Sequence, residues 1–441
     1  MGHEQQEEDE PPRGGAEDVT AADFAAMLTG LILAVHFTML EQLPGVVAKH
    51  AARVGMRDVL IYLADLQQRS CVLLTEHEPP PGKDGEPREL ALEGTVAGRA
   101  FQRGEILPAS SVQQDPNQWW VPLLDGVERL GVMRISTTAD SPTNMDDMRV
   151  LAGLVALLVV AKRGTSETHA RLVRRRQMNV AAELQWRLMQ PQTFATDRVV
   201  ISAVMEPAYE VSGDAFDYSL TASNVYVSIF DAMGHDTAAG LTANLALASC
   251  RNSRRQGASL VQSAKAAEAL LFEQFGGNRY VTSILADLEL DTGLMRWISC
   301  GHHMPILIRG RTAVSLSCAP GLPIGIGGNL PITVCESQLQ PGDRLVLYTD
   351  GITEARRPGG REFGLERFTD FLIRHQTDGL PVPETLRRLI RHHLHYHHGQ
   401  LGDDATVLVL EWHGPEPYRP GEAADLVGVP EPEPAIRPVP K

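Results

Sequence analysis

Apolar, strand-like segments in the second half of the chain carry aspartates at or beside their tips. VYVSIFD ends at Asp231, RLVLYTD ends at Asp350, and ATVLVLEW follows the pair Asp403 and Asp404. Asp214 stands in EVSGDAFDY, after another apolar strand and its loop. Because these strands are predominantly apolar, they are expected to lie in a buried sheet. The sequence therefore predicts buried sheets with carboxylates gathered at one end.

Carboxylates gathered at one end of a sheet repel one another, and all but one are driven toward protonation unless cations neutralise them. Hard oxygen ligands, without His or Cys at metal-binding spacing, favour Mg²⁺ or Mn²⁺ over zinc. Two such ions can activate a water and polarise a phosphoryl oxygen. A single aspartate at a strand end is more often a turn former or a helix cap. Its recurrence in one domain, each time near a glycine or another acid, favours a two-metal site.

Length and charge limit the classes of protein that the chain can represent. With 441 residues it is too long for one ordinary core, so two or three domains are expected. Its 43% hydrophobic and 22% charged residues are typical of a globular protein. The net charge of -15 argues against general binding to nucleic acid, which is a polyanion.

The cysteines and the apolar stretches bear on the compartment. Five cysteines, at positions 71, 250, 300, 318 and 335, are scattered without CxxC or zinc-ribbon spacing, which predicts reduced thiols in the cytoplasm. The N-terminus lacks the residue order of a signal peptide. The most apolar stretches, Phe24–Leu40 and Val150–Ala161, are interpreted as buried or dimer-forming helices, not as membrane spans. We therefore expect a cytoplasmic homodimer.

Composition and periodicity divide the chain into five segments. Residues 1–18 are acidic and residues 414–441 are rich in Pro and Glu, and both are expected to be disordered. Residues 20–162 predict an α/β sensor domain, and residues 191–413 predict an α+β catalytic domain. Between them, residues 163–190 predict a helical linker that ends before Pro191.

The linker carries one apolar stripe, formed by Val173, Val180, Leu184 and Leu188. A stripe of this length suits a helix that packs on the catalytic domain and suits a parallel two-stranded coil in a dimer equally well. In the catalytic domain, helices are predicted over Thr237–Gln256, Leu260–Gly276 and Leu365–Arg374. The histidine-rich run from His392 to His398 is interpreted as a solvent-facing helix.

The N-terminal domain is expected to begin with a helix Phe24–Leu43, with a shorter helix allowed after Pro44-Gly45. Strands Val59–Leu63 and Cys71–Leu74, a turn and short helix within Leu92–Gly104, a hairpin across Asp125-Gly126 and a helix Met145–Lys162 are expected to follow. The short helix with its Gly-containing turn, followed by VPLLDGVERLGVMRIS, resembles the end of a GAF domain. The resemblance implies a pocket for a small-molecule ligand or a dimerisation surface.

The motifs of the second half resemble the bacterial sporulation-protein-E/RsbU-type branch of the PPM (protein phosphatase 2C-like) serine/threonine phosphatases. The resemblance covers about residues 180–412. It begins at AAELQWRLMQP and continues through VSGDAFDY, FDAMGHD and YVTSILADLELDTGLMRWISCGHHMPILI, then APGLPIGI, LQPGDRLVLYTDGITEAR and GDDATVLVLEW. Each block alone is weak, but the series in this order is highly specific. It implies a PPM-type α-β-β-α sandwich.

The resemblance also implies a catalytic centre. Asp214 and Asp231 match the core metal ligands of the family, with Asp231 bridging two Mn²⁺ or Mg²⁺ ions and Ala232 contributing its backbone carbonyl. His235 is a candidate for protonating the leaving oxygen or orienting the phosphate, with a structural role in a turn as the alternative.

A second set of residues completes the implied centre. Asp350 and Asp403 match ligands of the second ion, and Asp404 is the adjacent alternative. Glu210 and Asp217 are candidate outer-shell groups that orient metal-bound waters. The chain departs from the family pattern at two turn positions, where Ser212 and Asp236 replace common glycines.

The implied reaction is direct attack of metal-activated water on phosphoserine or phosphothreonine, without a phosphoenzyme. The absence of a Cys-x5-Arg nucleophile loop agrees with this reaction. The implied substrate is a phosphorylated anti-anti-sigma (STAS) protein, or a similar small regulator, in a bacterial partner-switching pathway. The alternatives are a catalytically silent scaffold of the same fold and a phosphatase that acts on a small metabolite.

Overall fold

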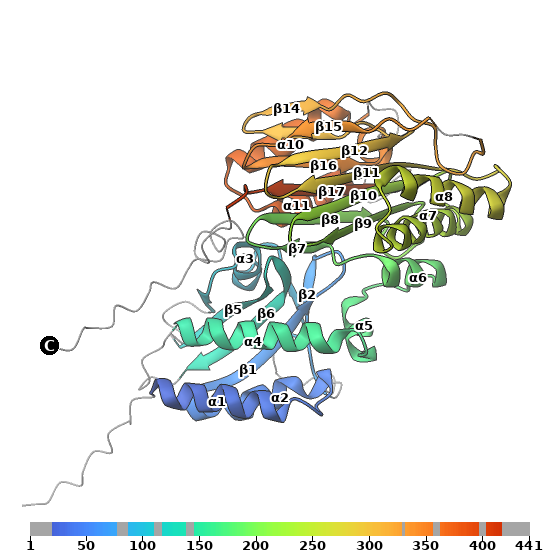
Figure 1. The fold of residues 1–441 in the computed structure, drawn as a ribbon. Helices are drawn as coiled ribbons and strands as arrows, with labels where there is room; N and C mark the ends of the chain where they lie inside the picture. Colours follow the sequence, from blue (N-terminus) through green and yellow to red (C-terminus); the bar gives the residue numbers. More distant parts are fainter. Residues whose placement is uncertain are drawn as a thin grey trace, which may run out of the picture.

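The structure is a computed structural model that describes residues 20–76, 87–109, 117–137, 145–328, 331–355, 362–396 and 403–416. Figure 1 shows an N-terminal unit built on one sheet and a C-terminal unit built on stacked sheets. Within those ranges, no helix combines the length and the apolarity needed to cross a bilayer. The segments expected to be disordered, 1–18 and 414–441, lie outside the described residues except for 414–416.

The N-terminal unit contains one antiparallel sheet in the order β3-β2-β1-β6-β5-β4. Its strands are β1 (Met56–Ala64), β2 (Ser70–Leu73), β3 (Glu89–Ala91), β4 (Leu107–Pro108), β5 (Gln118–Asp125) and β6 (Glu128–Thr137). Its main helices are α1 (Ala21–Ala34), α2 (Leu43–Ala51), α3 (Val96–Arg103) and α4 (Met145–Arg163). Ile61 and Leu63 pack toward α1, α2 and α4, whereas Tyr62 packs toward α3, so both faces of the sheet are covered.

One helix prediction in this unit is wrong and the hairpin prediction is confirmed. Strands β5 and β6 pair on either side of Asp125-Gly126. The helix predicted over Phe24–Leu43 instead ends at Ala34, and a new helix begins at Leu43. Pro44 lies in the first turn of this second helix, where its missing amide hydrogen removes no helical hydrogen bond. This proline therefore marks a helix start.

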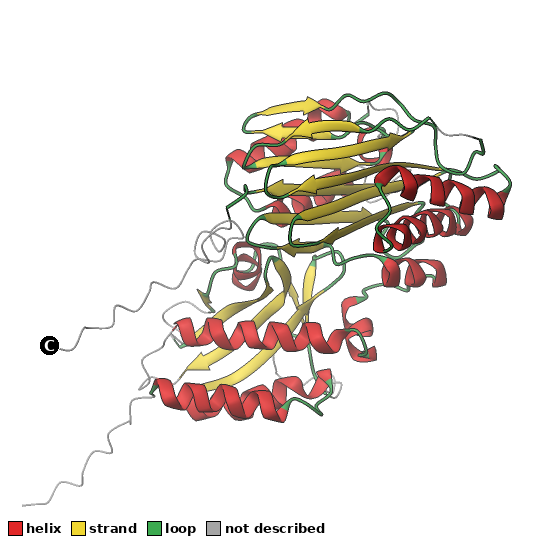
Figure 2. Ribbon diagram, in the orientation of Figure 1, coloured by secondary structure: helices red, strands yellow, loops and turns green. Residues whose placement is uncertain are grey.

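The C-terminal unit stacks two antiparallel sheets, in the orders β15-β12-β11-β10-β9 and β14-β13-β16-β17-β8-β7. The first contains β9 (Asp214–Leu220), β10 (Asn224–Ala232), β11 (Val281–Glu289), β12 (Leu294–Cys300) and β15 (Cys335–Gln338). The second contains β7 (Thr193–Ala195), β8 (Val199–Glu206), β13 (Ile306–Arg309), β14 (Thr312–Ser315), β16 (Asp343–Tyr348) and β17 (Ala405–Trp412). Figure 2 shows helices flanking the stacked strands.

Helices cover the outer face of each sheet and give an α-β-β-α layering. Helices α7 (Thr237–Arg255) and α8 (Leu260–Phe275) lie on the first sheet, and α10 (Leu365–Thr377) and α11 (Val382–Tyr396) lie on the second. Strand β16 is apolar along most of its length because both of its faces are buried. Its Leu345 and Leu347 face the other sheet, whereas Val346 and Tyr348 face α10 and α11.

The linker forms two short helices instead of one, α5 (Glu167–Val173) and α6 (Val180–Leu188). The predicted apolar stripe is therefore broken, because residues 174–179 are not helical. Val180 and Leu184 are exposed, whereas the Ala182 and Gln185 side of α6 is buried and contacts α7. The helix thus packs on the C-terminal unit through its small and polar face.

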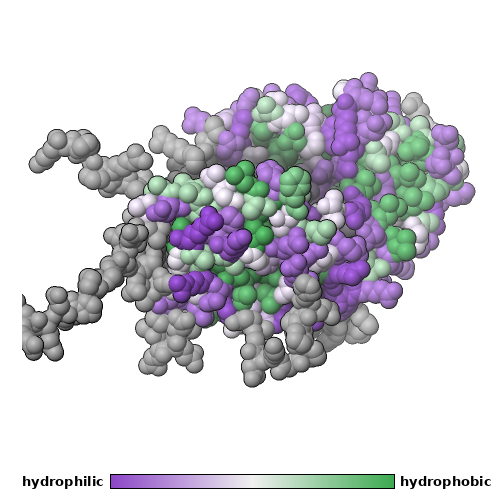
Figure 3. Space-filling view, turned by 90° about the horizontal axis from the view of Figure 1, so that it is seen from below, coloured by the Kyte–Doolittle hydropathy of each residue, from purple (hydrophilic) through white to green (hydrophobic). Residues whose placement is uncertain are grey.

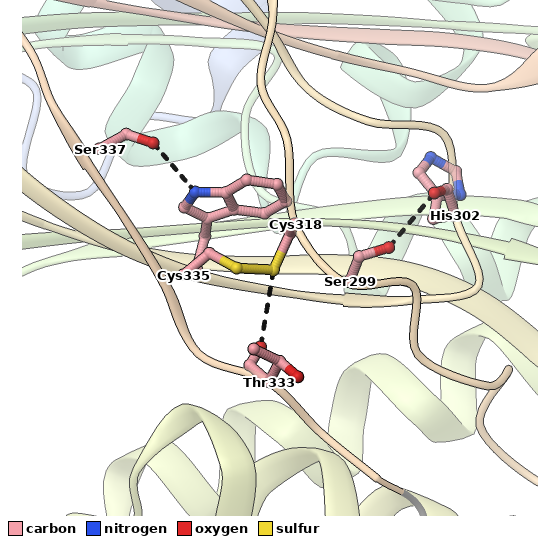
Figure 4. The surroundings of a disulfide bond; sticks show 7 residues. Ser299, His302, Cys318, Thr333, Cys335 and Ser337 are labelled. Carbon is pink, nitrogen blue, oxygen red and sulfur yellow. Dashed lines mark hydrogen bonds between the residues drawn. A yellow bond between two sulfur atoms is a disulfide. The ribbon is translucent and has the colours of Figure 1, made fainter.

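The expectation that all thiols are reduced is wrong for one pair, because Cys318 and Cys335 form a disulfide with their Cα atoms 5.9 Å apart. Pairing of β15 with β12 places Cys335 opposite Trp297, and the chain returns past them at Cys318 (Figure 4). This meeting depends on sheet register, which cysteine spacing does not report. Cys71, Cys250 and Cys300 are free and buried, as small apolar side chains commonly are.

Candidate metal centre

The predicted aspartates lie where strands of both sheets end. Asp214 begins β9 and Asp231 is the next-to-last residue of β10, and the two are directly opposite in the antiparallel register. Asp350 begins the short helix α9 (Asp350–Thr353), two residues after β16 ends. Asp403 and Asp404 immediately precede β17, which pairs with β16. Like charges directly opposite on neighbouring strands destabilise a sheet, so this arrangement needs compensation.

Hydrogen bonds tie the aspartates of the two sheets together. The Gly213 amide donates to Oδ2 of Asp404, which joins the start of β9 to the start of β17. The Thr349 hydroxyl donates to Oδ2 of Asp214 at 2.8 Å and accepts from the Thr406 amide at 2.9 Å. Thr349 is fully buried, so its hydroxyl fixes the direction of the Asp214 carboxylate.

The carboxylates also lie within electrostatic reach of one another. Burial raises the pKa of Asp214 well above its ordinary value, and the charges of Asp231 and Asp404 raise it further. Burial, followed by the charges of Asp350, Asp403 and Asp404, raises the pKa of Asp231 to about 7. Burial and the Asp403 charge also raise the pKa of Asp350. The cluster therefore holds more negative charge than its surroundings stabilise.

The donor set fits hard divalent cations. Its side-chain donors are mainly carboxylate oxygens, which Mg²⁺ and Mn²⁺ prefer, and a cation among them would offset the repulsion that raises their pKa values. The backbone approaches closely at the same place. A Cβ atom on Gly213 would lie 3.0 Å from the Ala232 carbonyl oxygen, and one on Gly351 would lie 1.8 Å from the Asp404 carbonyl oxygen. Only glycine permits these approaches.

The structure does not bring the two predicted outer-shell residues into the cluster. Asp217 lies three residues beyond Asp214 on an extended strand, so its side chain points to the opposite face. There it forms ion pairs with Arg251 at 2.7 Å and Arg254 at 3.0 Å on α7. Among the described contacts, the exposed Glu210 has no side-chain hydrogen bond or ion pair. The expectation for Asp217 is therefore wrong, and that for Glu210 gains no support.

His235 is exposed in the loop before α7. Burial raises the pKa of Asp404 to about 6, and the nearby His235 opposes part of that rise, which places His235 beside the cluster. The neighbouring Asp236 replaces a common glycine for a local reason. Its side chain caps α7 by accepting from the Ala239 amide at 2.7 Å and pairs with Arg279 at 3.2 Å. This departure from the family pattern therefore changes a helix cap and leaves the carboxylates in place.

Residues that the sequence interpretation missed lie at the border of the cluster. One ligand atom from each of His303, Asp350 and Glu354 lies within 4.8 Å of the others. The His303 ring stacks on Tyr348, with ring centroids 5.8 Å apart. Glu354 follows Asp350 by four residues, a spacing that brings side chains together on one helical turn and that was available in the sequence. No sequence signal marks His303, because it follows a Gly-His pair that is typical of a turn.

His302 has a different role from its neighbour. It is buried, and burial lowers its pKa to about 3, so the ring is neutral. Its Nε2 donates to the Tyr348 carbonyl at 3.0 Å, because a carbonyl oxygen can only accept. Its Nδ1 therefore accepts from the Thr282 hydroxyl at 2.6 Å. This ring connects β11 to β16 behind the carboxylates.

Comparisons with known proteins include one family match, which lies in the second half of the chain. The family described as Stage II sporulation protein E (SpoIIE) matches residues 221–413. Phosphoserine phosphatase RsbU of Bacillus subtilis is 24% identical over 238 residues, which are 53% of this chain and 69% of RsbU. Phosphoserine phosphatase RsbP of the same organism is 23% identical over 185 residues, which are 41% of this chain and 46% of RsbP.

Among solved structures, the SiaA-PP2C domain of Pseudomonas aeruginosa is similar to 53% of this chain and 94% of that domain, with 20% identity and a TM-score of 0.45. The chain thus spans about two thirds of RsbU but less than half of RsbP.

Proposed function

Because the C-terminal half of this chain is a SpoIIE/RsbU-type phosphatase domain of the PPM family, we propose that the protein is a metal-dependent protein serine/threonine phosphatase. The observation that carries the proposal is the gathering of carboxylates from both sheets around Asp231, whose pKa is raised to about 7 by burial and by Asp350, Asp403 and Asp404. The similarity to the two phosphoserine phosphatases named above supports phosphoserine as the group that is hydrolysed.

We propose that two Mn²⁺ or Mg²⁺ ions bind here, with Asp214, Asp231 and the Ala232 carbonyl as ligands of the first, and Asp231, Asp350 and Asp403 as ligands of the second. When bound, such ions supply an activated water and positive charge beside the phosphoryl group. Asp231 is the proposed shared ligand, because its carboxylate interacts with aspartates that precede or follow strands of the other sheet.

Asp403 is favoured over Asp404 as the ligand, since the Asp404 carboxylate already accepts the Gly213 amide and is nearly buried. In this proposal Asp404 holds the loop that carries Asp214, and Thr349 orients the Asp214 carboxylate. The exposed His235, beside Asp404, donates a proton to the leaving serine or threonine oxygen.

The proposed substrate is a phosphorylated STAS-type regulator, on the support of the similarity to RsbU. We propose residues 20–162 as a GAF-like regulatory domain that takes a small-molecule ligand, residues 163–190 as the linker and residues 191–413 as the catalytic domain. The six-stranded antiparallel sheet of the N-terminal unit, with its hairpin and long final helix, supports this assignment.

A homodimer is proposed through the N-terminal unit. Leu33 near the end of α1, Phe37 in the turn after it and Leu157 on α4 are large apolar side chains that remain exposed. Figure 3 shows hydrophobic patches among polar residues on the face seen from below. Burial of such side chains between two copies would contribute to association.

The test compares wild type, Asp231→Asn and the control Asp370→Asn, which removes an exposed carboxylate on α10. With Mn²⁺ and p-nitrophenyl phosphate, we expect Asp231→Asn to lose more than about 100-fold in kcat/KM, because loss of outer partners alone costs about 10- to 100-fold. Asp370→Asn is expected to match wild type. Full activity in Asp231→Asn contradicts the proposal.

The substrate class is tested with a phosphorylated STAS protein and free phosphoserine under the same conditions. We expect the phosphoprotein to be the better substrate by kcat/KM. Preference for free phosphoserine indicates a metabolite phosphatase. Binding of the phosphoprotein without turnover, in wild type loaded with Mn²⁺, indicates a silent scaffold.

A further inference from the structure

Gln185 of the linker helix α6 forms three hydrogen bonds to the main chain of the segment that carries Asp214. Its Nε2 donates to the Ser212 carbonyl at 2.9 Å and to the Asp214 carbonyl at 2.7 Å. Its Oε1 accepts from the Ser212 amide at 3.0 Å. The side chain is fully buried, so water cannot replace these bonds. The linker thus holds the backbone on both sides of Gly213.

These bonds fix the position of a proposed metal ligand. Asp214 begins β9, and the residues before it form a loop without strand pairing. The loop is also tied by the Gly213 amide to Asp404, by the Gly213 carbonyl, which accepts from the Ala232 amide at 3.0 Å, and by the Asp214 amide, which donates to the Ser212 hydroxyl at 2.9 Å. Leaving a buried polar group without its partner costs about 1 to 3 kcal/mol. The position of Asp214 therefore depends in part on the position of α6.

Helix α6 is held in place by hydrogen bonds to the C-terminal unit, and the preceding linker helix α5 is bonded to the N-terminal unit. The Asn179 side chain caps it through the Ala182 amide at 2.7 Å, and the Asn179 amide donates to the Tyr209 carbonyl at 3.1 Å. Trp186 donates from its indole to the Ala208 carbonyl at 2.8 Å. On the N-terminal side, the Leu66 amide in the β1–β2 turn donates to the carbonyl of Val173, the last residue of α5. A chain of contacts therefore runs from the N-terminal sheet through the linker to the Asp214 segment.

The packing of α6 is incomplete on one side. A cavity of about 360 Å³ lies between the linker and the two units, lined by Glu183, Trp186 and Arg187 of α6 and by Arg129 and His169 among others. Because fewer atoms oppose α6 there, a small displacement of the helix disrupts less packing than it would in a filled core. The helix that holds the Asp214 segment is therefore packed less tightly on the side of this cavity.

We propose that Gln185 is a positioning residue for Asp214, through which the linker helix α6 completes the cation site. This inference rests on the proposed function, because it assumes that Asp214 is a metal ligand. Gln185 touches neither the substrate nor the cation. It acts by holding the Ser212–Asp214 main chain.

The test uses the full chain and three variants. Gln185→Met keeps the length of the side chain and removes all three hydrogen bonds, and Gln185→Glu keeps its shape and removes both donated bonds. Gln177→Met is the matched control, because Gln177 is an exposed residue of the same linker. Mn²⁺ binding is measured by isothermal titration calorimetry, and the fold is checked by circular dichroism without metal.

We expect both Gln185 variants to bind Mn²⁺ about 10- to 100-fold more weakly than wild type, the range found for residues that orient metal ligands. With p-nitrophenyl phosphate, the Mn²⁺ concentration for half-maximal turnover rises by the same factor, while turnover at saturating Mn²⁺ is largely restored. A residue that serves only stability would leave this Mn²⁺ dependence unchanged. Gln177→Met is expected to match wild type.

Mn²⁺ binding by a folded Gln185→Met or Gln185→Glu variant as tight as that of Gln177→Met overturns the positioning role. If Gln185→Met does not fold, the isosteric Gln185→Glu decides. Wild type that neither binds Mn²⁺ nor hydrolyses the phosphate ester overturns the proposed function as well. If wild type is active and the Gln185 variants bind Mn²⁺ as tightly as wild type, the inference alone fails and the proposed function stands.

Discussion

Replacement of Glu384 by glutamine is expected to weaken the junction between the two units. Glu384, near the start of α11, accepts from Arg129 of β6 at 2.8 Å and from Arg387 and Arg388 of its own helix at 2.8 Å each. The side chains of Glu384 and Arg129 are only 1% and 7% exposed. Glutamine keeps the shape of this side chain but leaves the buried Arg129 guanidinium without its counter-charge.

Two routes give a similar magnitude for this loss. Breaking a buried ion pair by removing one partner costs about 3 to 5 kcal/mol. Burial alone would raise the pKa of Glu384, but hydrogen bonds from Arg387 and the charges of Arg129 and Arg387 outweigh it and lower the pKa from 4.5 to about 2. That difference corresponds to about 3 kcal/mol of stabilisation at pH 7.

The sign of the pH dependence follows from the lowered pKa. The stabilisation is fully present above the unfolded-state pKa of 4.5 and is lost as the pH falls toward the folded-state value of about 2. By the same linkage, about 1 kcal/mol remains at pH 3. The difference between wild type and Glu384→Gln should therefore shrink by more than half between pH 7 and pH 3.

The assay is urea unfolding of the full chain at both pH values, with Glu366→Gln as control because Glu366 is an exposed glutamate on the neighbouring helix α10. The control is expected to stay within about 0.5 kcal/mol of wild type. A Glu384→Gln protein as stable as the control at pH 7, or equally destabilised at both pH values, refutes the reasoning.

Two further predictions concern the disulfide and the glycines. Cys318→Ser should lower the midpoint of thermal unfolding by roughly 6 to 12 °C, since closing a loop of this length contributes about 3 kcal/mol. Dithiothreitol should produce the same shift in wild type and none in the variant. Equal midpoints for wild type and variant would contradict the prediction. Gly351→Ala should cost about 1 to 3 kcal/mol and weaken Mn²⁺ binding in calorimetry, because its Cβ would meet the Asp404 carbonyl. Gly153→Ala, in open space on α4, is the control, and equal effects in both variants exclude a local clash.

Features set by short-range patterns could be predicted from the sequence. The hairpin follows from an Asp-Gly turn between apolar runs, and helices α4, α7 and α8 follow from continuous periodicity without internal proline. The gathering of strand-end aspartates was also accessible, because apolar strands with polar tips limit where the tips can lie. Their cross-strand register, with Asp214 opposite Asp231, required the structure.

Features that depend on tertiary contacts were missed. His393 belongs to a histidine-rich run that was predicted to face solvent, yet it is fully buried and its Nε2 donates to the Gly351 carbonyl at 3.1 Å, next to Asp350. Asp217 is predicted to be an outer-shell group of the metal centre, whereas in the structure it forms ion pairs with Arg251 and Arg254 on the other face of the sheet. Both errors have the same cause, since residue type does not report which distant partner faces a side chain.

The central claim is that aspartates from both sheets share a pair of divalent cations. Anomalous X-ray diffraction from crystals grown with Mn²⁺ tests it directly. The account predicts two manganese peaks, with the Asp231 carboxylate between them, Asp214 beside one and Asp350 and Asp403 beside the other. Well-ordered aspartates with no anomalous peak among them at saturating Mn²⁺, or peaks only elsewhere on the molecule, would contradict it.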